Sequence, residues 1–344
     1  MRQTRGAEPG TTTHSGEYLS GALQVVVVGR RTLLAGMYCS EEGFQRVDLR
    51  DASTGEVIDV HGLGDKEWPH DPADHFTSFT WQDSPFILHL TRRRRGYRLL
   101  RVTRDGFELV EQVVDMSGHA AAPAVIAGRL AILVCESHSP SRAAVFHDAF
   151  DGDRVLGSWG VPQGWRCSRL LGTGGRTYAW LERQLSDATS AEERWRAAAE
   201  PGHLLWDVTS DTPVGPPLAV PVLQHGVWGL AGRPVALLGA RRQAWDLARR
   251  EPLGPRLGGM ELSNPQLGLL HGRPVLAGTT REALRVWDLG TGRMVGTTDV
   301  PDAPIATAIG PNGTVWAATR TGYVGNLAVT PARIHPSALR RAPF

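Results

Sequence analysis

The chain has 344 residues, 41% of them hydrophobic and 21% charged, which is ordinary for a soluble globular protein with a sizeable core. A formal net charge of +2 gives no reason to expect binding to nucleic acid or to a membrane surface, and no apolar stretch is long enough to span a bilayer. We therefore expect a cytoplasmic protein without a membrane-spanning segment. Cys39, Cys135 and Cys167 lie far apart in apolar runs, so we interpret them as small buried hydrophobes and expect no metal or cofactor.

Internal repetition is the strongest signal in the sequence. Gly-Arg-Pro-Val occurs at residues 232–235 and again at 272–275, each time followed by an apolar run and a Trp-Asp pair. Another Trp-Asp pair stands at residues 206–207, and Gly-Arg turns recur earlier in the chain, at 29–30, 128–129 and 175–176. A period of about forty to fifty residues with four short strands per unit is typical of β-propeller blades.

We predict an all-β fold, a single seven-bladed β-propeller of four-stranded antiparallel blades. In chain order the blades are expected at residues 19–62, 76–116, 121–159, 165–218, 222–258, 264–300 and 304–329, followed by a tail at 330–344. The seventh unit is one strand short. We predict that residues 8–13 supply that strand, because 10–14 resembles the fourth-strand segment 296–299. In the alternative, residues 1–18 are disordered and residues 333–339 close the ring.

The repeat pattern resembles the WD-repeat propeller family, especially bacterial, actinomycete-like members with Gly-Arg-Pro-Val before the second strand. The resemblance covers nearly the whole chain and is strongest in the fifth and sixth blades. Family blades usually carry a Gly-His before the first strand and an Asp after the second, which form a hydrogen-bonded network. Here Gly118-His119 is the only intact Gly-His at the start of a first strand, and the loops before Trp245 and Trp287 lack the Asp. We therefore expect apolar packing alone to hold most blades together.

In this family the loops from fourth to first strands, and from second to third strands, lie on one face of the ring. Three insertions map to that face. The first, residues 61–75, carries His70, Asp71, Asp74 and His75. These imidazoles and carboxylates suit a divalent metal site or an acid–base pair. Their spacing matches no metal motif, so the alternative is a polar loop whose side chains cap turns, with His75 in the core.

The second insertion is a run of four arginines between the second and third strands of the second blade: Arg92, Arg93, Arg94 and Arg95. Guanidinium groups bind carboxylates and phosphates through paired hydrogen bonds, so the run suits an acidic peptide. The alternative is a solvated turn in which Gly96 provides the positive φ.

The third insertion lies in the fourth blade, where Ser190 and Glu193 have the spacing of a capping box and residues 201–202 read as a helix stop. We predict a short helix over 191–199. A helix of this length is unstable alone, so Trp195 is expected to dock it onto the propeller or to present an aromatic anchor to a partner.

Weaker candidates lie near the mouth of the central channel. His225 and Trp228 stand at the start of the fifth blade, His119 at the start of the third, and Trp165 and Arg166 at the start of the fourth. Aromatic residues at these positions usually pack the inner rim. No nucleophile elbow, phosphate loop or dinucleotide fingerprint occurs in the sequence.

The leading functional hypothesis is a monomeric interaction scaffold that binds a partner protein or peptide, acidic if the arginine run takes part, on the loop face. The alternative is an enzyme or small-ligand binder at the channel mouth that uses the His/Asp loop. The sequence leaves open whether the chain is an enzyme and favours that it is not one, because no catalytic motif emerges.

Overall fold

The computed structural model describes residues 17–40, 44–66, 75–91, 96–113, 118–136, 143–183, 202–218, 222–238, 243–257, 263–280, 283–300, 304–310, 313–319 and 324–329. Within these ranges all regular structure is β-strand, in seven antiparallel sheets. None of these residues forms a helix of the length and hydropathy needed to cross a membrane. The predicted helix over 191–199 and both predicted closing segments lie outside the described residues, so they stay predictions.

Each sheet is one blade, and its strands follow chain order from the middle of the ring to the rim. Blade one has β1 (Glu17–Val28), β2 (Arg31–Ser40), β3 (Phe44–Asp51) and β4 (Val57–Lys66). Blade two has β5 (His75–Trp81), β6 (Ser84–Thr91), β7 (Gly96–Val102) and β8 (Phe107–Val113). Blade three has β9 (Gly118–Ile126), β10 (Arg129–Glu136), β11 (Ala143–Asp148) and β12 (Asp151–Gly160). Blade four has β13 (Trp165–Thr173), β14 (Arg176–Arg183), β15 (His203–Asp207) and β16 (Thr212–Pro213).

The remaining blades continue around the ring. Blade five has β17 (Val222–Leu230), β18 (Arg233–Leu238), β19 (Gln243–Asp246) and β20 (Glu251–Pro252). Blade six has β21 (Ser263–Leu270), β22 (Arg273–Thr279), β23 (Ala283–Asp288) and β24 (Met294–Asp299). Blade seven has β25 (Pro304–Ile309), β26 (Thr314–Thr319) and β27 (Val324–Ala328) in the described part of the chain.

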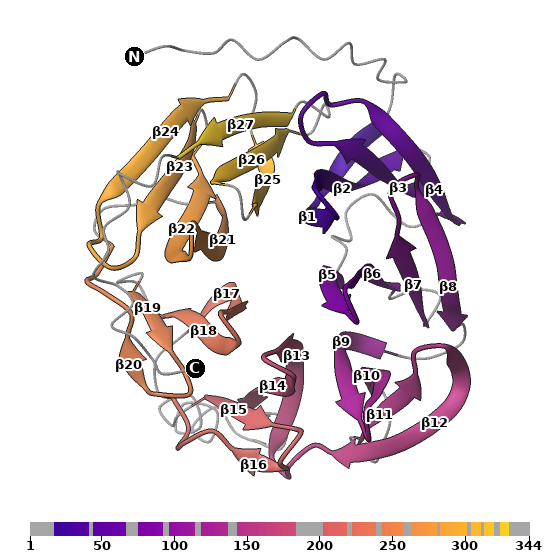
Figure 1. Cartoon of the computed structure of the whole chain (residues 1–344). Helices are drawn as coiled ribbons and strands as arrows, with labels where there is room; N and C mark the ends of the chain where they lie inside the picture. Colours follow the sequence, from indigo (N-terminus) through magenta and orange to yellow (C-terminus); the bar gives the residue numbers. More distant parts are fainter. Residues whose placement is uncertain are drawn as a thin grey trace.

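The seven blades form a ring with the first strand of each blade nearest the middle (Figure 1). These first strands run in the same direction. The later parts of β9, β13 and β17 lie close together. A Cβ on Gly172 of β13 would meet the carbonyl oxygen of Pro123 in β9, and a Cβ on Gly229 of β17 would meet the side chain of Thr173 in β13. Because the strands are parallel to one another, every turn from first to second strand lies on one face of the ring. The loops from second to third strands lie on the other face.

The strand sequences fit this arrangement because a blade is covered on both faces by its neighbours. The second strands are therefore nearly continuous apolar runs, as in β22, where every residue after Arg273 is buried. The fourth strands form the rim and expose much of their surface, as in β8 and β12. The propeller predicted from the repeats is confirmed by these sheets.

The recurring Gly-Arg dipeptide builds the turn between the first two strands. Ala231 and Gly232 have φ of 50° and 75°, and His271 and Gly272 have the same pair of values. Two consecutive residues with positive φ make a type I′ turn, whose twist matches that of a β-hairpin. The following arginine is then the first residue of the second strand, as Arg233 is in β18.

The arginine that begins the second strand, which in blade one is Arg31 after the Gly29-Arg30 turn, forms an ion pair with the aspartate that ends the third strand of the same blade. The nitrogen–oxygen distance is 2.8 Å for Arg31–Asp51 and 2.7 Å for both Arg176–Asp207 and Arg233–Asp246, and Arg129 pairs with Asp148 in the same way. The other carboxylate oxygen accepts backbone N–H groups of the next turn, for example that of Thr209 at 2.9 Å from Asp207.

These ion pairs correct the expectation that most blades are held by apolar packing alone. The usual family network is missing from the sequence, but an Arg–Asp network replaces it on the opposite face of the ring. At Asp51, a hydrogen bond from Ser53 is the largest cause that holds the pKa at about 2, and Arg31 adds to it. The charged form of Asp51 is therefore the one that its hydrogen bonds stabilise.

Apolar clusters fill the contact between each pair of neighbouring blades, seven clusters among the described residues. The cluster between the first and seventh blades contains Leu34 and Tyr38 from β2 with Ala308 and Trp316 from β25 and β26. The described strands therefore close the ring by packing blade one against blade seven.

Candidate binding site at the loop-bearing end of blade two

Two of the three predicted insertions join the sheet of blade two at the same end. His75, the first residue of β5, pairs with Leu90 of β6, and Thr91 pairs with Gly96 of β7. The connection 67–74 therefore enters the sheet beside the hairpin that carries residues 92–95. We call this the loop-bearing end of blade two.

The third insertion leaves blade four on the same face of the ring. Residues 184–201 connect β14 to β15, where Glu182 pairs with His203 and the backbone N–H of Arg183 donates to the Gly202 carbonyl at 2.9 Å. The strands that flank this insertion are thus paired by backbone hydrogen bonds, as β6 and β7 are on either side of residues 92–95.

Most of the predicted site residues lie outside the described part of the chain: His70, Asp71, Asp74, Arg92, Arg93, Arg94, Arg95 and Trp195. For three more the strand is described and the side chain is not: His75 in β5, His119 in β9 and His225 in β17. The structure therefore shows where these residues join the sheets and leaves their chemistry as a prediction.

Trp228 is described, and it packs in the core. Its side chain is buried in the cluster between blades five and six, and its indole Nε1 donates to Gln266 Oε1 at 3.1 Å. Both its apolar surface and its polar group are thus used within the protein. In blade four, Arg166 forms an exposed ion pair with Glu182 at 2.8 Å.

A row of four aligned side chains, three of them polar, crosses blade two below its loop-bearing end, on the face toward blade one. Strand pairing aligns Phe76, His89, Arg98 and Gln112 across the four strands. Arg98 donates from Nε to Gln112 Oε1 at 3.1 Å and from Nη1 to the Leu63 carbonyl of blade one. The guanidinium therefore places a fixed positive charge in the contact between the two blades, and this charge favours anions nearby.

His89 is the most unusual residue of this row. It is completely buried, packs edge-on against Phe76 with ring centroids 6.4 Å apart, and has no hydrogen-bond partner for Nδ1. Burial, and then the charges of Arg98 and His61, lower its pKa to about 3. Burial and Arg98 also lower the pKa of His61. Both rings are therefore neutral at neutral pH.

His61, His89 and Arg98 were not among the site residues predicted from the sequence. His89 left a signal, because it is the one polar residue in the apolar run at 86–90. No sequence pattern indicates His61 or Arg98, since their proximity depends on how blade one packs against blade two.

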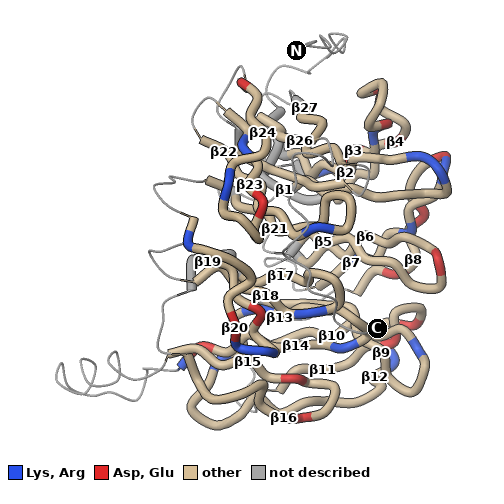
Figure 2. The backbone as a smooth tube through the Cα atoms, turned by 60° about the vertical axis from the view of Figure 1, so that its left-hand side comes forward, with Lys and Arg blue, Asp and Glu red and all other residues tan. Residues whose placement is uncertain are grey.

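Charge and metal-binding groups elsewhere give no competing site in the described part of the chain. Figure 2 shows basic and acidic positions scattered over the described blades on the side that it presents. No group of three or more described His, Cys, Asp or Glu residues is arranged to hold a metal ion.

Comparison with known proteins gives structural neighbours alone. No family model and no curated protein matches the chain. The WD40 domain of Pan2 from Neurospora crassa is similar in structure, with a TM-score of 0.53, 11% identity and 89% of each chain covered. BamB from Moraxella catarrhalis has a TM-score of 0.44 and 13% identity over 90% of this chain and 82% of BamB. At such identity the likeness to the Pan2 domain supports the propeller fold and carries nothing about activity.

Proposed function

We propose that this chain is a divergent WD-repeat propeller that acts as an interaction scaffold and binds an acidic peptide segment of a partner protein at the loop-bearing end of blade two. The observation that carries the proposal is the strand register. Residues 67–74 lead into β5, and residues 92–95 follow β6, which pairs with β5. Binding residues commonly lie on loops that a rigid scaffold positions.

The chemistry of the arginine run supports an acidic ligand. The four arginines at residues 92–95 follow β6 and precede β7 in the sequence, and Arg98 of β7 adds a fixed positive charge. Arginine forms paired, charge-assisted hydrogen bonds with carboxylates. A turn that only has to stay solvated does not require four arginines.

Fluorescence anisotropy with a panel of labelled Asp/Glu-rich peptides, each matched to an Asn/Gln version, tests this proposal. We expect acidic peptides to bind and their neutral versions to bind at least about tenfold more weakly, a difference of about 1.4 kcal/mol. Changing residues 92–95 to serine should weaken the acidic peptides by a similar factor.

A matched control removes the same amount of charge from the other face. Arg30, Arg104, Arg249 and Arg293 are exposed in turns of that face, and changing all four to serine also lowers the net charge by four. This variant should bind within about twofold of wild type. Equal losses in both variants, or no loss in either, would contradict binding at the loop-bearing end.

A second candidate function is small-ligand binding or catalysis by His70, Asp71, Asp74 and His75. The observation that favours it is the buried His89, whose Nδ1 has no hydrogen-bond partner, one residue from the pair between His75 and Leu90 but on the opposite face of the sheet. Titration with Zn²⁺ by calorimetry, together with thermal shifts across a metabolite panel, tests this candidate. A ligand response that His75→Ala removes would support it, and no response to any ligand would reject it.

A further inference from the structure

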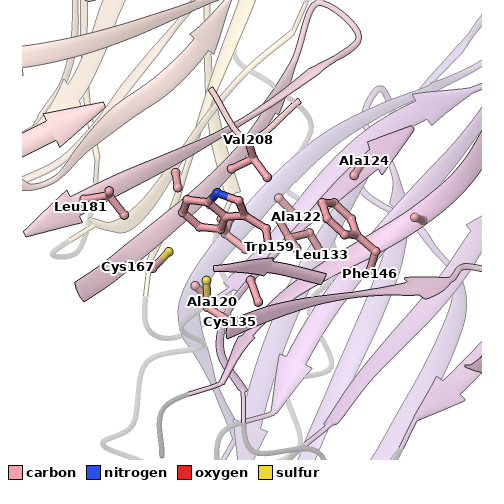
Figure 3. Close-up of a cluster of buried hydrophobic side chains, with 14 of the residues drawn as sticks. Ala120, Ala122, Ala124, Leu133, Cys135, Phe146, Trp159, Cys167, Leu181 and Val208 are labelled. Carbon is pink, nitrogen blue, oxygen red and sulfur yellow. The ribbon is translucent and has the colours of Figure 1, made fainter. Parts of the chain in front are cut away.

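Two cysteines from different blades meet in one apolar cluster. Cys135 lies on β10 of blade three and Cys167 on β13 of blade four, and they are 1% and 2% exposed. Figure 3 shows their sulfur atoms side by side, close to Ala120. Neither of them forms a disulfide in the structure.

Hydrogen bonding links the two thiols directly. Cys167 Sγ donates to the backbone carbonyl of Arg169 at 3.6 Å, and the side chains of Cys135 and Cys167 hydrogen-bond to each other. Because the Cys167 proton is used on the carbonyl, Cys135 is the donor to Cys167. The sulfur atoms thus face each other with no side chain between them.

The surroundings allow the small movement that an S–S bond requires. Cys135 pairs with Ala120 and Ala144 on the neighbouring strands, so its flanks carry only methyl groups. The pairing register shifts next to both cysteines, between Cys135 and Glu136 on β10 and between Cys167 and Arg169 on β13. Such bulges let a strand bend locally without breaking the rest of the sheet.

We propose that Cys135 and Cys167 are an oxidation site at which a peroxide forms a reversible disulfide between blades three and four. One thiol, as its thiolate, attacks a peroxide oxygen and becomes a sulfenic acid, with loss of water. The second thiol then attacks the sulfenic sulfur, the S–S bond forms and a second water leaves. In total, two thiols and one hydrogen peroxide give one disulfide and two waters.

The burial of the pair determines how fast it reacts. The hydrogen bond to Cys167, followed by burial, raises the pKa of Cys135, so the thiolate is scarce and the reduced form persists in a reducing compartment. The pair is therefore a slow oxidation site. Once formed, the disulfide ties the end of β10 to the start of β13 and limits the separation of the two blades in the unfolded chain.

Intact mass spectrometry on the full chain, in a Cys39→Ser background, tests the proposal. After hydrogen peroxide treatment and denaturation, we expect the protein to have lost two hydrogens and to take up no N-ethylmaleimide. Reduction with dithiothreitol before denaturation should restore two alkylated cysteines. Peptide mapping should identify the link between Cys135 and Cys167.

Single substitutions provide the matched control. Cys135→Ala keeps a small apolar side chain in an alanine-rich site, and its folding is checked by circular dichroism. It should form no internal disulfide, and dimedone should trap its remaining cysteine as a sulfenic acid. Oxidation should raise the melting temperature of the two-cysteine protein by about 4 °C and leave that of Cys135→Ala unchanged.

The proposal is overturned if both cysteines still react completely with N-ethylmaleimide after peroxide treatment that oxidises free glutathione. It is equally overturned if they oxidise separately to sulfinic acids, or if the disulfide forms only between molecules. None of these readouts involves the binding of a peptide, so they do not depend on the proposed function.

Discussion

Asp246 is completely buried and uses its two carboxylate oxygens for different elements. One oxygen pairs with Arg233 at 2.7 Å, at the start of β18, and the other accepts the backbone N–H of Arg249 at 3.0 Å, in the turn that follows. The equivalent aspartates of blades three and four are bound in the same way. Each one therefore fixes a hairpin turn and the adjacent turn of its blade together.

Replacing this aspartate should be costly. We expect Asp246→Ala to lower the free energy of unfolding by about 3 kcal/mol, because it leaves the partly buried Arg233 without its partner and removes the turn cap. Chemical denaturation of the two proteins measures the loss. The matched control is Glu251→Ala, which removes an exposed ion pair with Arg249 at 3.6 Å and should cost less than about 0.5 kcal/mol. Similar losses in the free energy of unfolding of the two variants would show that the buried ion pair stabilises the fold no more than the exposed one does.

His89 should make the protein acid-sensitive. Its pKa is lowered to about 3 in the fold, whereas a free histidine titrates near 6.5. Between these values the unfolded chain binds a proton that the folded chain does not, so stability falls as pH decreases from 6.5 toward 3. Over pH 7 to 4 this amounts to about 3 kcal/mol.

A pH series of denaturation curves for wild type and His89→Leu isolates this contribution. The other acid-sensitive groups are the same in both proteins, so the variant should gain about 3 kcal/mol relative to wild type between pH 7 and pH 4. Parallel stability curves would mean that His89 is protonated in the fold.

At the scale of elements, neighbouring blades also meet through glycines near the rim. A Cβ on Gly254, just after β20, would collide with the carbonyl oxygen of Leu289 in blade six. Because the obstacle is backbone, Gly254→Ala must push the two blades apart, and we expect a loss of at least about 3 kcal/mol in thermal or chemical unfolding. Gly62→Ala is the control, since a Cβ there has nothing within 4 Å, and it should change stability by less than about 0.5 kcal/mol. A small effect of Gly254→Ala would show that this contact is loose.

The elements also show what could be predicted from the sequence. The repeated Gly-Arg and Trp-Asp pairs carry the blade pattern, because each marks a turn or a strand end that depends on local residues alone. The ion pair between Arg176 and Asp207 could not be predicted, since the two residues are 31 apart and meet only through the register of β14 and β15. The same holds for His61, His89 and Arg98, which come together across two blades.

At the scale of the whole molecule, the ring gives its two faces different structures. The face with the Gly-Arg turns is held by short type I′ turns and Arg–Asp pairs. The opposite face receives all three insertions, which the resemblance to WD-repeat propellers led us to expect. A scaffold of this kind can vary its loops without disturbing the contacts between blades, because those contacts lie within the sheets.

Hydrogen–deuterium exchange of the full chain, with and without the acidic peptide that binds most tightly, locates the peptide on one face of the ring. We predict that saturating peptide slows exchange in segments covering residues 67–75 and 90–98. The turns at 127–129 and 231–233, on the other face, should exchange at the same rate with and without peptide. Protection confined to those turns, or unchanged exchange at the loop-bearing end of blade two under saturating peptide, would contradict the account.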